Sequence, residues 1–197
     1  MTQYSLRRFV LVAHRWLGLG SCVLLAVIGA SGAAYLIPAF ERYRPFLERL
    51  HMHLMIPRAG QGIVIAASVA AMLLEAGGLY LWWKRKVWTI RWRAGWRTAV
   101  QDLHHVSGIV MLAVMLLLAA TGVGRVLVRQ VLPSYSFVVK ATNYAHTGLA
   151  FPGPIQAIYV IGALGFLVQG TTGVIMWWPR GRRSRRTQTQ AARPAAG

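Results

Sequence analysis

Four of the six histidines stand at positions that repeat along the chain, and imidazole nitrogens are common metal ligands. His14 precedes two glycines by 4 and 18 residues, and His104 precedes two glycines by the same spacings. His51 precedes a proline by 6 residues and a Trp-Trp pair by 31, and His146 repeats this pattern. The spacing indicates one metal-binding centre between His14 and His104 and another between His51 and His146.

The elements that must position these side chains are membrane-spanning helices. Hydrophobic residues make up 56% of the 197 residues and charged residues only 13%, whereas soluble domains carry about 25% charged residues. A helix needs about 20 mostly apolar residues to cross a bilayer, and four segments qualify: 9–37, 61–83, 104–128 and 154–178. We expect the first to be kept as a span and not cleaved as a signal peptide, since it is long for one and the repeat requires it.

The repeat divides the chain into two similar halves, 5–86 and 95–180, and each half contains two spans. We therefore predict an all-α membrane protein whose four transmembrane helices form two tandem hairpins, related by an axis along the membrane normal. Residues 1–180 form a single transmembrane domain in this prediction. The basic segment 181–197 is predicted to be a disordered cytoplasmic tail.

Basic residues indicate the direction of the spans. Most of the 22 Lys and Arg residues lie at the N-terminus, in the connection 84–97 and after residue 179. The positive-inside rule places both termini and this connection in the cytoplasm, and the connections 38–60 and 129–153 outside. The net charge of +18 then reflects topology and contact with the lipid bilayer. We expect no nucleic-acid partner, although WTIRWRAGWR (88–97) interleaves Trp with Arg.

Paired imidazoles from facing helices are a natural axial ligand set for haem iron. The only cysteine is Cys22 and no CxxCH motif occurs, so we expect haem b, one or two per chain, bound without a covalent link. His105 stays open as an alternative to His104, because side chains adjacent on a helix point about 100° apart and only one can face the axis. The rival metal centre is zinc or copper held by His51, His53 and His146.

Two charged residues in the spans are further candidates. Glu75 lies within the second span, where it could accept a proton or tune the site, or form a neutral hydrogen-bonded carboxyl. Arg125 lies at the outer end of the third span, where it could pair with a haem propionate or extend to the lipid headgroups. No recognised nucleotide-binding motif occurs, so electrons would come from a quinol or a redox partner protein.

Several stretches, LRRFVLVAHRWLGL, DLHHVSGI, HTGLAFPGP and GTTGVIMWWPR, resemble the PepSY-associated transmembrane family. This family includes inner-membrane ferric-siderophore reductases and iron-regulated membrane proteins. The resemblance covers residues 5–180 and implies b-type haem bound by His14, His51, His104 and His146. It also implies transfer of electrons across the bacterial inner membrane to ferric chelates outside.

Larger members of this family carry a periplasmic PepSY domain between their first two spans, where this chain has only residues 38–60. The chain therefore resembles a short, four-helix branch, and a ferric siderophore would dock only on short basic loops: Arg42, Arg44, Arg49, Arg58, Arg129 and Lys140. The function expected is that of a possible membrane ferric-chelate oxidoreductase. The alternatives are a non-catalytic accessory subunit of an iron-uptake or respiratory complex, and a small transporter, which the lack of broken-helix motifs disfavours.

Overall fold

The computed structural model describes residues 3–132, 134, 136–151 and 153–191, and within them it contains helices and no strand. Four helices are long and apolar enough to cross a membrane, which confirms the predicted all-α membrane fold. They are α1 (Gln3–Leu36), α3 (Gly60–Trp83), α4 (Trp96–Val131) and α6 (Gly153–Ala191). The candidate spans within them are Tyr4–Leu36, Gly60–Trp83, Trp96–Val131 and Gly153–Trp178.

Shorter helices occupy the connections. The 3₁₀ helix η1 (Pro38–Tyr43) and the α-helix α2 (Arg44–His53) join α1 to α3. The 3₁₀ helix η2 (Trp92–Ala94) lies just before α4, and α5 (Ser136–Thr147) lies between α4 and α6. The candidate histidines of the outer pair are therefore on short helices rather than on the spans.

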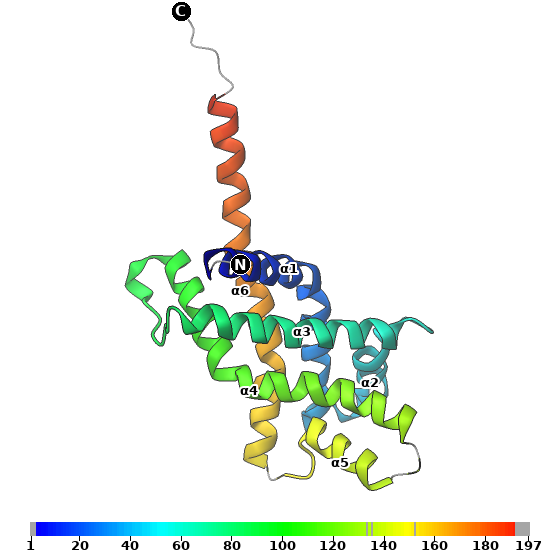
Figure 1. Ribbon diagram of the computed structural model, residues 1–197. Helices are drawn as coiled ribbons and strands as arrows, with labels where there is room; N and C mark the ends of the chain where they lie inside the picture. Colours follow the sequence, from blue (N-terminus) through cyan, green and yellow to red (C-terminus); the bar gives the residue numbers. More distant parts are fainter. Residues whose placement is uncertain (1–2, 133, 135, 152, 192–197) are drawn as a thin grey trace, which may run out of the picture.

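The four long helices surround a common interior. Helix α1 packs against α3 and α6, and α4 packs against the same two helices. Helices α3 and α4 run side by side in Figure 1, and α6 crosses behind them. The most extensive contact joins α1 to α6, across the two halves, so the packing does not separate the bundle into two hairpins. It does place α1 and α4, the first helices of the two halves, on opposite sides of the interior.

Small residues let the long helices approach one another. The buried face of α3 carries Ala67, Ala71, Glu75 and Trp82, and Ala67 and Ala71 pack with Leu25 and Ala119 in the core. Small side chains are typical of helix interfaces in membranes because they allow close backbone contact. One cavity lies on each side of this core, and Leu25 and Ala71 line both cavities.

The connection between α3 and α4 is fixed to the bundle by one buried carboxylate. Asp102 is 1% exposed and accepts three hydrogen bonds from Arg91. Its Oδ2 accepts from the Arg91 backbone N–H at 3.1 Å and from Nε at 2.9 Å. Its Oδ1 accepts from Nη2 at 3.0 Å. Asp102 also raises the pKa of Arg91 above its ordinary value, through the hydrogen bond and the charge of the carboxylate. The basic connection is therefore held against the start of α4, which carries His104.

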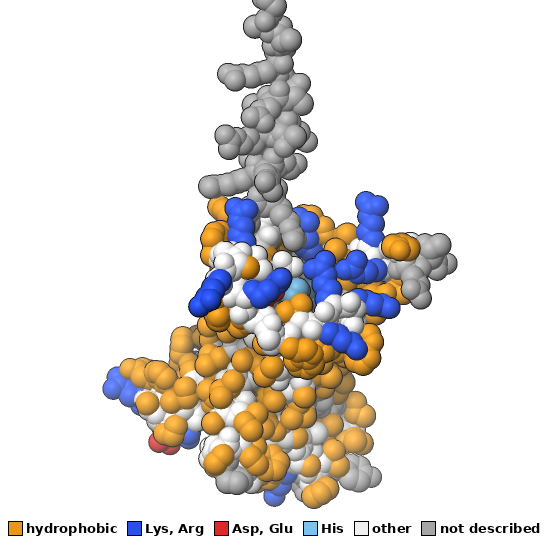
Figure 2. Space-filling view, turned by 90° about the vertical axis from the view of Figure 1, so that its left-hand side faces the viewer, with side chains coloured by type: hydrophobic (Ala, Val, Ile, Leu, Met, Phe, Trp, Pro, Cys, Tyr) orange, Lys and Arg blue, Asp and Glu red, His pale blue; other side chains and the backbone are white. Residues whose placement is uncertain are grey.

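Basic side chains gather at one end of the molecule, and the surface below them is largely hydrophobic (Figure 2). This distribution matches the polar end and the apolar belt that a multi-pass membrane protein presents. The backbone of α6 stays helical to Ala191, beyond the boundary at 180 that the sequence predicted for the tail, and it projects away from the other helices (Figure 1). The rest of the predicted tail, 192–197, lies outside the described residues.

Candidate functional site

The structure brings the side chains of His14 on α1 and His104 on α4 opposite each other across the interior. Their ring centres are 6.4 Å apart and the rings are nearly perpendicular, at 88°. Two imidazoles bound to opposite sides of one metal ion, with bonds of about 2 Å, would place their ring centres about 6 Å apart. The separation of this inner pair therefore suits a shared metal centre.

The inner pair lines a cavity of about 460 Å³, which also contains Glu75, Arg15 and His105 in its wall. Ligand sites in proteins typically measure about 300–1,000 Å³. The inner cavity therefore has room for a group of the size of a cofactor.

His104 is held by a hydrogen bond that decides which of its nitrogens carries the proton. Its Nδ1 lies 2.8 Å from Oγ1 of Thr172, and that hydroxyl donates its own proton to the carbonyl of Val168 at 2.7 Å. The Thr172 oxygen can only accept from His104, so Nδ1 carries the proton and Nε2 keeps its lone pair. Ligating histidines in metal sites typically donate their second nitrogen in this way.

His14 lacks such an orienting bond. Its Nδ1 is buried without a well-formed hydrogen bond in the described part of the chain, although the backbone of Leu74 lies beside it. His105 lies 6.3 Å from His104 and lines the same cavity, and its Nδ1 is also buried and unpaired. Of the two neighbours, His104 is the one whose ring faces His14 in a direct pair.

Helix α6 is tied to α4 at the level of His104 by a polar side chain within the span. The amide of Gln169 donates to Oγ of Ser107 at 2.7 Å and to the backbone carbonyl of His104 at 3.3 Å. Gly108 leaves the space that the Gln169 amide fills. Gln169 was missed at the level of sequence, where its signal was an amide in the middle of a largely apolar span.

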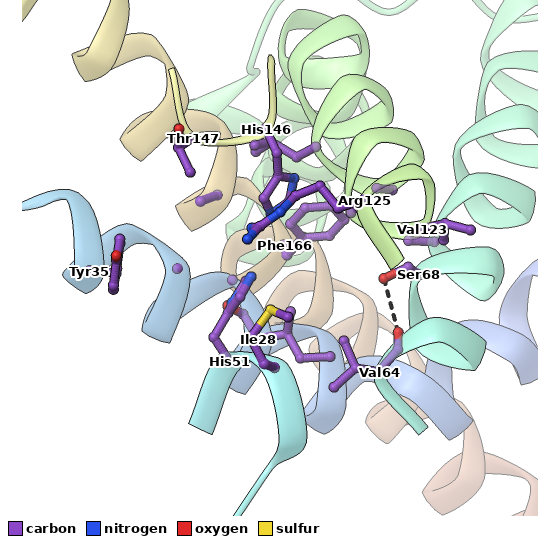
Figure 3. A pocket seen from close by; sticks show the side chains of 18 of the residues that line it. Ile28, Tyr35, His51, Val64, Ser68, Val123, Arg125, His146, Thr147 and Phe166 are labelled. Atoms are coloured by element: carbon purple, nitrogen blue, oxygen red, sulfur yellow. Dashed lines mark hydrogen bonds between the residues drawn. The ribbon is translucent and has the colours of Figure 1, made fainter. Parts of the chain in front are cut away.

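His51 on α2 and His146 on α5 form the second, outer pair, with ring centres 5.9 Å apart and an interplanar angle of 40°. Figure 3 shows the two side chains pointing toward each other from opposite sides of a pocket. Their cavity measures about 160 Å³ and is smaller than that of the inner pair. The sequence repeat therefore predicted both pairings, although the role of the pairs as ligands stays a prediction.

Both outer histidines are oriented through Nδ1. That nitrogen of His51 lies 2.8 Å from the carbonyl oxygen of Ile28, which can only accept a hydrogen bond. Nδ1 of His146 lies 3.0 Å from Oγ1 of Thr121, and this hydroxyl donates its proton to the Leu117 carbonyl at 2.6 Å. Both imidazoles therefore carry a proton on Nδ1 and a lone pair on Nε2.

The outer histidines stay uncharged at neutral pH. Burial, together with the charges of His51 and Arg125, lowers the pKa of His146 to about 3. Burial also lowers the pKa of His51, against the opposing effect of the Ile28 carbonyl, and Arg125 again adds to the decrease. A neutral imidazole is the form that binds metal.

Each of the four repeated histidines packs against a glycine, and the glycines repeat as well. A Cβ atom on Gly32 would lie 2.9 Å from Cε1 of His51, and one on Gly122 would lie 3.2 Å from Cε1 of His146. A Cβ atom on Gly78 would lie 3.3 Å from Cε1 of His14, and one on Gly173 would lie 3.8 Å from Cε1 of His104. Gly32, Gly122 and Gly78 therefore leave space that the imidazoles occupy, while Gly173 is in ordinary contact distance of His104.

Tyr159 positions the helix that carries His146. Its hydroxyl donates to the carbonyl of Ala145 at 2.9 Å, and its ring lies against Gly148, where a Cβ atom would come within 2.9 Å. Gly148 has φ +67°, a conformation that favours glycine. The turn that follows α5 is therefore fixed at Gly148, two residues after His146 of the outer pair.

The two charged candidates lie in different cavities. Glu75 is 8% exposed and lines the inner cavity, with neither carboxyl oxygen hydrogen-bonded in the described residues. Arg125 lines the outer cavity near Glu48 and Tyr35, and its Nε is buried without a partner there. Both positions therefore leave polar atoms available to a bound group.

His53 points to solvent, unlike its neighbour His51. The described residues contain no cluster of three or more His, Cys, Asp or Glu side chains that could hold a metal ion. A zinc or copper centre built on His51, His53 and His146 therefore has no support among these residues.

The two cavities approach each other at the middle of the bundle. Leu25, Ala71 and Phe166 line both of them. These three side chains form the partition between the inner and outer pairs. A group bound in one cavity would be separated from the other by one layer of apolar side chains.

Four apolar helices of membrane-spanning length define this chain as a multi-pass membrane protein. The family model described as the PepSY-associated TM region matches residues 38–130, which confirms over this segment the family resemblance inferred from the sequence. The match includes His51, Glu75, His104 and Arg125. No curated protein and no solved structure matches the chain.

Proposed function

We propose that this protein binds haem b between its paired histidines and carries electrons across the bacterial inner membrane, with ferric chelates such as siderophores as the final acceptor. The observation that carries the proposal is the pairing of the repeated histidines at 6.4 and 5.9 Å. In three of the four, Nδ1 is occupied by an acceptor, so the Nε2 lone pair is left for iron.

The inner pair is the better candidate for the first haem. Its cavity of about 460 Å³ falls in the usual range for ligand sites, whereas the outer cavity of about 160 Å³ lies below it. Side chains around His51 and His146 would have to move apart to admit a second macrocycle. We therefore expect the inner site to bind haem more readily than the outer site.

Arginine side chains line both cavities, where they could bind the propionate carboxylates of a haem. Arg7, Arg15 and Arg85 line the inner cavity, and Arg125 lines the outer one. Guanidinium groups bind carboxylates through paired, charge-assisted hydrogen bonds. The buried, unpaired Nε atoms of Arg15 and Arg125 are donors of this kind.

A bound haem supplies the one-electron chemistry, while this chain binds, orients and shields it. Phe166, Leu25 and Ala71 keep water from the space between the two cavities. Electrons would enter from a quinol or a reduced partner protein at the basic end, which the positive-inside rule assigns to the cytoplasm together with both termini. The ferric chelate would be met outside by the basic residues near α2 and α5.

The stoichiometry of haem in single variants tests the assignment. Replacing His104 by alanine should remove the inner haem, and His105→Ala should leave it in place, as measured by the pyridine haemochrome assay on purified protein. His53→Ala is the matched control for His51→Ala, because both residues lie on α2 and only His51 faces a partner ring.

Equal loss of haem in His105→Ala and His104→Ala would contradict the assignment of ligands. A protein that binds no haem in any form would contradict the proposed function, and the accessory-subunit alternative would then lead.

A further inference from the structure

Glu75 is a buried carboxyl group that the fold itself does not use. It lies on the buried face of α3, 8% exposed, one turn from Gly78, which packs against His14. Neither oxygen has a hydrogen-bond partner in the described residues. An ionisable side chain in a membrane span is costly, and its presence by default indicates a functional site.

The repeat shows that the scaffold does not require a carboxyl group at this position. The corresponding residue in the second half is Gly170, which packs against the backbone of Cys22; a Cβ atom there would lie 3.3 Å from the Cys22 carbonyl oxygen. Glu75 therefore departs from the symmetry of the repeat, although both positions line the inner cavity. Its side chain lines the inner cavity together with the His14–His104 pair.

Charged and titratable groups line the same cavity from three elements, but none of those described forms a hydrogen bond or ion pair with Glu75. They are Arg7, His14 and Arg15 on α1, Arg85 after α3, and His104 and His105 on α4. From α6 the described lining includes the uncharged amide of Gln169. In such a low-dielectric interior, a change of one charge in the cavity acts strongly on a carboxyl group beside it.

We propose that Glu75 binds one proton for each electron that the inner site accepts, which ties the reduction potential of the site to pH. The inference rests on the proposed haem function. A haem held by His14 and His104 would supply the one-electron change, from ferric to ferrous, and the Glu75 carboxylate would take one proton from water to become the neutral acid. The net charge of the cavity then stays constant. The electron comes from a quinol or a reduced protein in the cell, and from dithionite in the test.

Spectroscopic potentiometry at several pH values tests this coupling without measuring turnover. The full-length protein in detergent is titrated at pH 6, 7, 8 and 9, and a His146→Ala form isolates the signal of the inner haem. Each pH unit is a tenfold change in proton concentration, which converts to about 59 mV for a one-electron couple. We expect the midpoint potential of the inner haem to fall by up to this amount per unit, and Glu75→Gln to abolish the dependence.

Glu41→Gln is the matched control, because it makes the same chemical change at a side chain that is 71% exposed and outside both cavities. It should keep the pH dependence of the unaltered protein. Bound haem with a pH-independent potential, or a dependence that survives in Glu75→Gln, would overturn the role of Glu75 and leave the proposed function standing. A colourless protein would overturn both. Glutamine preserves the size of the side chain, and an unchanged haem spectrum would show that the variant is folded.

Discussion

At the scale of single residues, the side chains that orient the histidines matter as much as the histidines themselves. Thr172 and Thr121 each donate a hydrogen bond to a backbone carbonyl and accept one from Nδ1 of a histidine. From sequence, Thr121 and Thr172 are expected to pack and form hydrogen bonds between membrane helices. Their contacts assign them to the support of His104 and His146.

Replacing Thr172 by valine tests this support. Valine keeps the shape but removes the acceptor, so the His104 ring loses its fixed tautomer and orientation. Loss of such outer contacts typically weakens metal binding about 10–100-fold, and we expect a decrease of that order in haem affinity, measured by titration of haem into haem-free protein.

Thr142→Val is the matched control for Thr172→Val, because among the described residues the Thr142 hydroxyl bonds only to two carbonyls of its own helix, those of Val138 and Val139. Equal affinities for haem in the two variants would contradict an orienting role for Thr172.

The lowered pKa values of the outer histidines also predict how the stability of the folded protein changes with pH. The folded protein keeps His146 neutral down to pH about 3, while in the unfolded chain the group has its ordinary value of 6.5. Between these values the unfolded state binds the additional proton, so the stability of the folded state falls as the pH falls from 6.5 toward 3. Thermal unfolding of the haem-free protein should show lower midpoints at pH 5 than at pH 7.

The size of this decrease should shrink in His146→Gln. Midpoints that stay constant over this range, or a decrease that is unchanged by the substitution, would contradict a buried neutral histidine at position 146.

At the scale of elements, the sequence predicted the four spans because long apolar runs leave few alternatives, and the structure confirms all four. The pairing of the histidines also followed from sequence, since equal spacings in a duplicated chain place equivalent residues on facing helices. The extent of α4 did not, because it begins at Trp96, within the basic region where hydropathy is low. Gln169 and Asp102 were missed, because their partners depend on how the helices pack.

Glycine positions on the long helices test the packing of the outer site. A Cβ atom on Gly122 would press on the His146 ring at 3.2 Å, whereas one on Gly124, on the same helix, meets no atom within 4 Å. Gly122→Ala should therefore lower the occupancy of the outer haem, measured by haemochrome stoichiometry. Gly124→Ala should leave occupancy unchanged and stabilise the helix by about 0.5–1 kcal/mol. A loss of haem in both variants would point to a general effect on α4 rather than to the histidine.

At the scale of the whole molecule, the basic end and the apolar belt define an orientation in the membrane (Figure 2). The positive-inside rule predicts that the connection 84–97 faces the cytoplasm. In a Cys22→Ser background, an impermeant maleimide should label Arg42→Cys in intact cells. Thr89→Cys, which is exposed like Arg42, should be labelled only after the inner membrane is opened. The reverse pattern would contradict the predicted topology.

The family match supports a membrane protein, while the proposed haem chemistry is argued from the geometry of the histidine pairs. The match covers residues 38–130 and so includes one histidine of each pair, while His14 and His146 lie outside it. The repeat connects the two regions, because it relates His14 to His104 and His51 to His146. The proposed haem sites therefore depend on the pairing of the histidines at 6.4 and 5.9 Å.

The most direct test is a dithionite-reduced minus oxidised absorbance spectrum of the protein purified in detergent from cells supplied with haem. We expect the sharp bands of a six-coordinate b-type haem, with the inner site filled first. A colourless preparation would contradict the central claim that the repeated histidines are haem ligands.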